Sequence, residues 1–298
     1  MTSFSGTSPE SPSLAGLRKN SSRPRDIFNI IMTALSVLCV VITLIPLVLV
    51  LAFVTIQGAG SLTPALFTEL PPPPGLDGGG IANAIIGTLV VVAIATLISV
   101  PFGVMAAVYL SEFSEDGQVA RWVRFFTNVL SGVPSIISGV FVYALLVRTG
   151  LTGYSAVAGG VALAVLMLPT IIRTTDEALN IIPQEIRWAS IGVGSSRYQT
   201  VLQIVLPAAI PSILTGVTLA IARAAGETAP LIFTALFSSF WPNGVLQPIA
   251  TLSVLVYNFA IVPFEPQQEL AWAGSLILVL LVLLTSMIAR FVTRQKTY

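Results

Sequence analysis

The chain has 298 residues, of which 55% are apolar and only 9% are charged. An average soluble domain contains about 25% charged residues, so this composition excludes an ordinary soluble protein. The net charge is +1 and the basic residues are dispersed, which gives no indication of nucleic-acid binding. There is no histidine and a single cysteine, Cys39, so neither an intrachain disulfide nor a cysteine-based metal site is expected.

Long apolar blocks make up most of the sequence. Each is near or above the roughly 18–20 residues that a helix needs to cross the hydrocarbon core of a bilayer. We therefore expect an all-α integral membrane protein with six membrane-spanning helices. The expected spans are 27–56, 81–110, 129–147, 155–172, 209–237 and 270–289.

The first 26 residues are polar, rich in serine and proline, and contain four basic residues. A basic segment before an apolar run is also found in signal peptides, whose apolar part has about 7–15 residues. The apolar run here is about twice that length. We therefore expect a retained first helix that follows a disordered leader, 1–26, with the membrane domain occupying 27–298.

The distribution of basic residues predicts the orientation. Twelve of the 14 lie at the two ends of the chain and in the loops after the second and fourth expected spans. Short loops rich in Lys and Arg remain cytoplasmic, so both termini are expected in the cytoplasm. The opposite loop 238–269 has an apolar middle, 248–262, that is too short and broken to span, and a re-entrant or interfacial segment is expected there.

Residues typical of helix ends recur in the longest cytoplasmic loop, 173–207. Thr174 and Glu177 match a capping box. Pro183 suits the first turn of a short helix, and Gly192 and Gly194 supply a stop. The loop is therefore expected to fold into short helices, although an ordinary ordered loop remains an alternative on this pattern alone.

A last short helix is expected from Ser195 or Ser196 through Ile204, closed by Pro207. The whole segment resembles the EAA loop of ABC importer permeases, in which Glu-Ala-Ala is followed by three residues, Gly, nine residues and Ile-x-Leu-Pro. Trp188 and Ser190 depart from that pattern, where the family has Glu and Ala. The residues that match it are Ala189, Gly194, Ile204, Leu206 and Pro207.

Three further segments resemble the PstA-type permeases of phosphate-specific ABC importers: LPTIIRTT at 168–175, ARAAGETAPLIFTAL at 222–236 and QELAWAG at 268–274. The resemblance implies the type I importer permease fold in the inner membrane, phosphate as substrate, and a coupling helix in the 173–207 loop that docks on an ATPase. It also implies a PstC-like second permease subunit, a PstB-like ATPase dimer and an external PstS-like phosphate-binding protein. No nucleic acid is expected as a partner.

The lysines support a separate ATPase. A P-loop requires a lysine after its glycine-rich turn, but the only lysines are Lys19 and Lys296, which lie outside any such motif. ATP and Mg²⁺ are therefore expected in the partner, with no cofactor and no catalytic residue in this chain.

Arg223 and Glu227 lie in an apolar stretch, where each charge costs about 2.5–3.5 kcal/mol at the centre of a span. They are either structural glue between helices or part of a translocation pathway. On a helix the favourable order is acid before base, and here it is reversed, which argues against a purely local pair. Small residues on the same segment allow close helix packing, so the charges are expected to face protein or water.

A planar guanidinium suits phosphate oxygens, so a pathway role is favoured for Arg223. Glu227 would moderate the positive field and accept a hydrogen bond from protonated phosphate. The resemblance suggests the same pathway role for Arg173, for which a topology-setting surface charge is the alternative. Three other functions remain open: a permease for another oxyanion, a secondary transporter, although no inverted repeat is visible, and a membrane scaffold.

Overall fold

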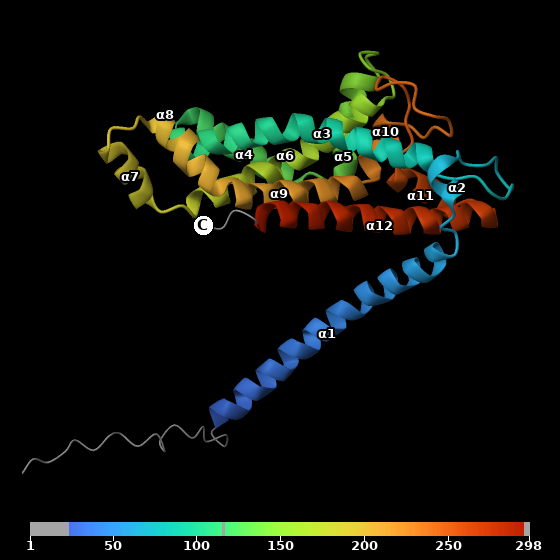
Figure 1. Ribbon diagram of the computed structural model, residues 1–298, viewed down its shortest axis with the longest axis horizontal. Coiled ribbons are helices and arrows are strands. Elements are labelled where there is room, and N and C mark those ends of the chain that lie inside the picture. Colours follow the sequence, from blue (N-terminus) through green and yellow to red (C-terminus); the bar gives the residue numbers. More distant parts are fainter. Residues whose placement is uncertain (1–23, 115–116, 295–298) are drawn as a thin grey trace, which may run out of the picture. The chain divides into compact units, whose positions relative to one another are not determined.

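The computed structural model describes residues 24–114 and 117–294, where all the regular secondary structure is helical (Figure 1). The predicted all-α class is thus confirmed. The chain divides into two units, 1–53 and 54–298, which are described separately. The predicted leader lies outside the described residues, apart from its last three residues, which begin α1.

Helix α1 (Pro24–Ala59) accounts for the described part of the first unit and extends into the second. Its length and hydropathy are those of a membrane span, as the sequence predicts. The Ser36 and Thr43 hydroxyls donate to the carbonyl oxygens of Met32 and Cys39, one turn earlier. These polar groups are therefore satisfied inside the helix, as a lipid environment requires.

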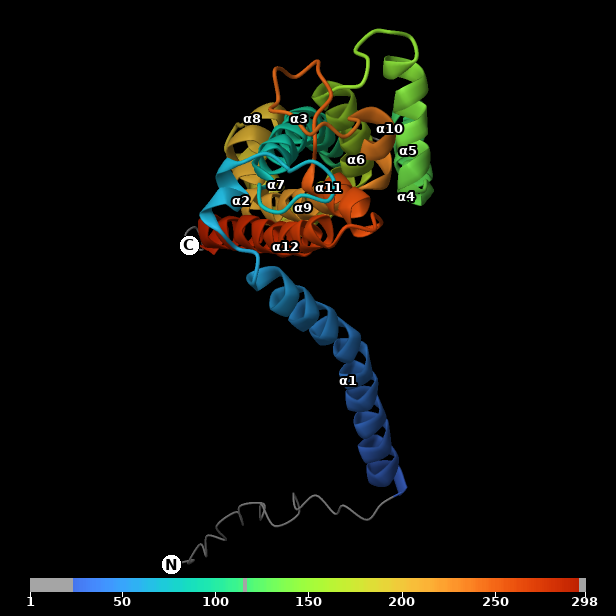
Figure 2. The ribbon, with the colours of Figure 1, turned by 90° about the vertical axis from the view of Figure 1, so that its right-hand side faces the viewer.

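The second unit is a bundle of long helices joined by short ones and by single π-helical turns, labelled η. The long helices α3, α6, α9 and α12 run side by side (Figures 1 and 2), with α6 packed against both α3 and α9, and α12 packed against α9 and α11. The elements are α2 (Pro64–Thr68), α3 (Ala82–Val108), η2 (Tyr109–Phe113), α4 (Gln118–Gly132), α5 (Ser135–Val142), η3 (Tyr143–Val147), α6 (Ala156–Asn180), α7 (Gln184–Gly192), α8 (Arg197–Thr200), η4 (Val201–Val205), α9 (Leu206–Gly226), α10 (Ala229–Thr234), α11 (Leu252–Ala260) and α12 (Glu265–Arg294).

A buried apolar core lies between α3, α6 and α9, with Val91, Leu163 and Ile171 at its centre. Glycine allows the backbones to approach closely there. A Cβ atom on Gly160 would lie only 2.5 Å from Cγ2 of Ile94. Such small residues are typical of helix packing in membranes, where van der Waals contact holds helices together.

Five helices in the described ranges can cross a membrane, and a sixth span exists if α4 and α5–η3 count as one. The third span, predicted at 129–147, is not one continuous helix, because the chain bends by 110° between Gly132 and Ser135. Pro134 explains the bend, since it lacks an amide hydrogen and forces Val133 into an extended conformation (φ −75°, ψ 125°).

Two predicted span ends also shift. The fourth span continues to Asn180, so Thr174 is not a helix cap; its hydroxyl donates to the Thr170 carbonyl inside α6. The fifth span, predicted to reach residue 237, ends at Gly226, and a short α10 follows.

Pro207 does not close a helix as predicted, because the helical run continues from Arg197 through the π-helical turn η4 and along α9 to Gly226. The apolar segment 248–262 contains only the nine-residue α11, which is too short to span. Its placement at the membrane interface stays a prediction.

Candidate functional site

Arg223 and Glu227 lie where α9 ends. Arg223 is in the last helical turn, whereas Glu227 is extended (φ −71°, ψ 130°) and follows Gly226. The Ser253 hydroxyl of α11 donates to the Glu227 backbone carbonyl at 2.9 Å, which fixes the break. The charged pair therefore occupies a helix terminus, and the prediction that both residues lie within one helical span is wrong.

The two side chains contact each other loosely. Arg223 Nε lies 3.5 Å from Glu227 Oε1. The Arg223 side chain is 70% exposed in the isolated chain, and that of Glu227 is 18% exposed. A pair held at this distance leaves most of the guanidinium donors free to contact another group.

Arg173 and Arg223 line the same cavity, of about 230 Å³, although 50 positions separate them in the sequence. Arg173 comes from α6 and Arg223 from α9. Hydroxyl groups add further polar atoms to the lining. The other lining residues are Leu130, Ser131, Val133, Leu166, Pro169, Thr170 and Thr174.

The cavity depends on the close approach of α6 and α9. Gly216 faces Thr174, and a Cβ atom at Gly216 would lie 2.2 Å from the Thr174 hydroxyl oxygen. Ala220 and Ala224 continue the same stripe and are both 2% exposed. The predicted small-residue face of this helix is thus buried against protein, and it holds Arg223 close to α6.

A second cavity, of about 200 Å³, adjoins the first at Arg173, which lines both. Arg173 Nη2 donates to Asn128 Oδ1 at 3.3 Å, and Arg124 Nη1 lies 3.5 Å from Asp176 Oδ2. Three arginines from α4, α6 and α9 therefore follow one another across two neighbouring cavities. The Asp176 carboxylate lines the second cavity, and the Glu227 carboxylate contacts Arg223.

Asn128 and Asp176 are candidate residues that were not predicted from the sequence, and Arg124 was expected only as a topology-setting charge. The available signal was the spacing of Arg124, Asn128 and Ser131 on α4. These positions are i, i+4 and i+7, which share one helical face. The described residues contain no group of three or more His, Cys, Asp or Glu side chains suited to a metal.

The loop 173–207 has the predicted helix, turn, helix arrangement in its second half. Pro183 precedes α7, which ends at Gly192, and Gly194 adopts φ +96°. That left-handed conformation favours glycine and terminates the helix. Ser196 caps α8 in a capping box with Gln199, as one of the two predicted alternatives proposed.

The residues that match the EAA pattern lie along this loop. Ala189 and Gly194 are exposed, and Ile204 is 37% exposed within η4. Leu206 packs against the core, and Pro207 is exposed at the start of α9. Several large apolar side chains are also exposed on the loop: Trp188 (67%), Ile191 (50%), Val193 (85%), Tyr198 (68%) and Leu202 (59%).

The sequence and the fold have known relatives. Residues 99–298 match the family described as "Binding-protein-dependent transport system inner membrane component". The chain is 41% identical over 270 residues to the phosphate transport system permease protein PstA of Yersinia pestis, covering 91% of each chain. It is 41% identical over 276 residues to PstA of Pasteurella multocida, covering 92% of this chain and 97% of the relative.

Among solved structures, a chain of a bacterial alginate ABC transporter, crystallised with an alginate-bound periplasmic protein, has a TM-score of 0.66 at 14% identity. The match covers 93% of this chain and 98% of the other. At this level of identity the likeness concerns the fold, which is that of a type I ABC importer permease.

Proposed function

The chain belongs to the family of binding-protein-dependent transport system inner membrane components, among the PstA permeases, and from this premise we propose that it moves inorganic phosphate across the membrane. It is a multi-span inner-membrane subunit of an ABC importer, a system that includes an ATPase and a binding protein. The proposed substrate is the one that the names of its PstA relatives state.

One observation carries the proposal: Arg173 and Arg223 line one cavity together with the hydroxyls of Ser131, Thr170 and Thr174. Two guanidinium groups offer planar forks of donors that match the oxygens of a tetrahedral anion. Hydroxyl groups supply additional donors. The cavity therefore has the chemistry of a transient phosphate site on a translocation pathway.

Glu227 gives the proposed site a way to release the anion. Its carboxylate, 3.5 Å from Arg223, offsets part of the positive charge. Phosphate that carries a proton can donate a hydrogen bond to this carboxylate, whereas fully ionised sulfate has no proton to donate. Glu227 is thus proposed to favour phosphate over sulfate while limiting the residence time at Arg223.

ATP hydrolysis is proposed to act through the 173–207 loop. Helix α7 and the residues that follow it expose large apolar side chains, including Trp188 and Val193, which suit burial against a partner. ATP and Mg²⁺ would bind to that partner, and both termini would lie on the same, cytoplasmic side. The proposed assembly contains a PstC-like permease, two PstB-like ATPase subunits and an external PstS-like receptor.

The test is transport by the complete assembly in proteoliposomes, with labelled phosphate and sulfate outside and ATP inside. We expect phosphate, delivered by its receptor, to stimulate ATP hydrolysis and to accumulate. Replacing Arg223 or Arg173 by Lys keeps the charge but removes the forked pair of guanidinium donors. A charge-assisted hydrogen bond contributes about 1.5–3 kcal/mol. Uptake should therefore fall about tenfold or more.

Arg148→Lys is the matched control, because Arg148 is an exposed arginine that lies outside both cavities. Stimulation by another oxyanion but not by phosphate would assign a different substrate. Accumulation without ATP would identify a secondary transporter, and no uptake of either anion would favour a scaffold.

A further inference from the structure

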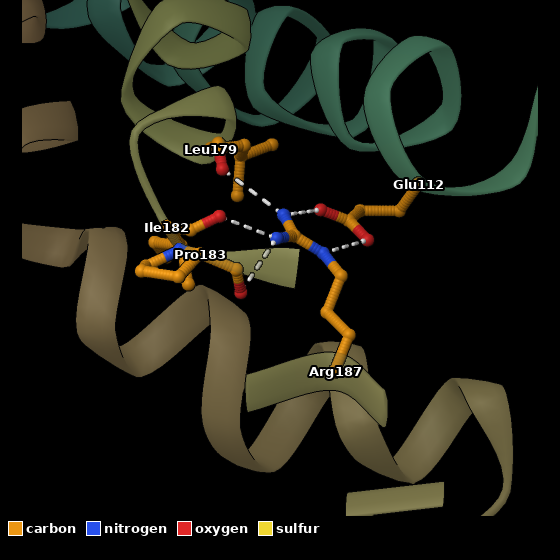
Figure 3. A network of polar contacts seen from close by, with 5 residues as sticks. All are labelled: Glu112, Leu179, Ile182, Pro183 and Arg187. Carbon is orange, nitrogen blue, oxygen red and sulfur yellow. Dashed lines mark hydrogen bonds and ion pairs between the residues drawn. The ribbon is translucent and has the colours of Figure 1, made fainter. Parts of the chain in front are cut away.

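Arg187 and Glu112 form a buried ion pair between two distant segments (Figure 3). Arg187 lies on α7 and is 9% exposed, whereas Glu112 lies in η2 at the end of α3 and is 6% exposed. Charged side chains are almost never buried unless they are paired. Arg187 is one of the basic loop residues from which the cytoplasmic orientation is predicted, so its burial is unexpected.

All three guanidinium nitrogens of Arg187 donate hydrogen bonds. Nε and Nη2 donate to the two carboxylate oxygens of Glu112, the former at 3.1 Å. Nη2 also donates to the Leu179 carbonyl at 3.0 Å, and Nη1 to the carbonyls of Ile182 at 2.7 Å and Pro183 at 3.5 Å (Figure 3). The donors are thus fully engaged within the protein, so this arginine is unsuited to hold a transported anion.

These bonds join three elements at one point. The Leu179 carbonyl belongs to the last turn of α6, where it also accepts the Ile182 amide at 3.3 Å. The C-terminal end of a helix favours a nearby cation. Glu112 belongs to the π-helical turn that ends α3. Arg187 therefore fixes α7 to both α3 and α6, and α6 is the helix that carries Arg173.

Phe113, the residue after Glu112, contacts helix α8 in the second part of the loop. The ring centroids of Phe113 and Tyr198 are 4.7 Å apart, and the Arg197 guanidinium carbon lies 5.8 Å from the centre of the Phe113 ring. Consecutive residues of η2 thus contact α7 through an ion pair and α8 through ring contacts, on either side of Gly194. The bidentate ion pair has a defined geometry, whereas ring contacts tolerate sliding.

We propose that Arg187, through Glu112 and the Leu179 carbonyl of α6, is the positioning residue that makes α7, α6 and the end of α3 move as one body during transport. A displacement of α7 by the ATPase would then reach Arg173 directly. This inference rests on the proposed function, because it presupposes that α7 receives the motion. The inference assigns the rigid connection to Arg187. This residue comes one position before Trp188, and Trp188 is the position at which the family's EAA pattern has Glu.

A buried ion pair that only stabilises the fold is the alternative. Replacing such a pair by apolar residues of similar size is often neutral or even stabilising, whereas removing one partner leaves an unpaired buried charge. The double variant Glu112→Leu with Arg187→Met therefore separates stability from transmission. It keeps similar side-chain volumes but removes the bidentate geometry and the bonds to the carbonyls of Leu179, Ile182 and Pro183.

The experiment measures phosphate uptake and ATP hydrolysis together in proteoliposomes that contain the full importer. For the double variant we expect normal assembly and retained ATP hydrolysis, with uptake per ATP lowered within the 5- to 150-fold range typical of coupling free energies. Arg187→Lys, which keeps the charge but loses the fork, should lower the same ratio by a smaller factor. Glu69→Gln with Arg148→Met is the control, because both residues are exposed and lie outside the coupling loop.

Wild-type uptake per ATP in both the double variant and Arg187→Lys would overturn the inference and leave the pair a structural one. The wild-type arm tests the proposed function separately: if the unaltered importer shows no phosphate-stimulated ATP hydrolysis, the function itself fails. The two failures are thus distinguishable in one set of measurements.

Discussion

At the scale of single residues, the extended backbone at Glu227 decides what its carboxylate can do. Because the helix ends at Gly226, the side chain is not held in a helical i,i+4 register and approaches Arg223 only to 3.5 Å. The rule about the order of charges on a helix therefore does not apply to this pair. In the proposed pathway, this loosely held carboxylate exchanges its contact with Arg223 for the proton of a passing anion.

This position leads to a prediction for Glu227→Gln. The amide retains hydrogen-bonding capacity but loses the negative charge that favours a proton donor over a fully ionised anion. A hydrogen bond to a charged group is worth about 1.5–3 kcal/mol, so discrimination between phosphate and sulfate should fall about tenfold or more. Competition between the two anions in receptor-driven uptake measures this ratio, with Glu69→Gln as the control. Unchanged discrimination would contradict the role given to Glu227.

The residues of the two cavities differ in how visible they are in the sequence. Arg223 and Glu227 could be singled out because charges in an apolar stretch are costly, and Arg173 followed from the resemblance alone. Asn128 and Asp176 escaped notice because α4 and the end of α6 are polar enough to pass for loop and surface. Only the packing of α4 against α6 brings Asn128 to within hydrogen-bonding distance of Arg173.

At the scale of elements, existence and type of the long helices follow from hydropathy, whereas their ends depend on single residues. Pro134 turns one predicted span into two helices bent by 110°. Pro207 looks like a terminator in the sequence but lies inside a helical run from Arg197 to Gly226, directly after the π-helical turn η4 and Leu206. The conformation of the neighbouring turns therefore decides whether a proline interrupts a helix or is accommodated within it.

The backbone conformation of Gly194 leads to a prediction about the proposed coupling loop. Its φ of +96° strains any other residue, and a Cβ atom there meets no neighbour within 4 Å. Gly194→Ala should therefore act through the backbone alone, at a cost of about 1–2 kcal/mol for left-handed geometry. We expect the exit from α7 to change, so that phosphate uptake per ATP falls while assembly with the ATPase persists.

Gly150→Ala is the matched control, since Gly150 has φ +78°, similar open space and a place outside the coupling loop. It should carry a comparable strain without altering the coupling ratio. Uptake per ATP that remains normal in Gly194→Ala would refute the coupling role of this turn.

At the scale of the whole molecule, the proposed pathway requires that Arg223 meets water inside a protein that is otherwise apolar. The long helices are held by core contacts and glycine approaches, and the polar side chains of α4, α6 and α9 gather around two cavities instead of facing lipid. Exposure of a side chain in the isolated chain does not by itself indicate contact with water. Many of the exposed side chains are apolar and suit contact with lipid or with another subunit.

A cysteine in place of Arg223 tests for this path, in a background where Cys39, the only native cysteine, is replaced by Ser. In the assembled importer we expect a membrane-impermeant thiol reagent to modify Cys at 223, with a rate that changes when ATP is bound and falls when phosphate is present. Leu97→Cys is the control: Leu97 is 75% exposed near the middle of α3, where an apolar side chain suits lipid, so it should not react. If the cysteine at 223 stays unmodified in every nucleotide state, water does not reach this position and Arg223 cannot pass an anion along.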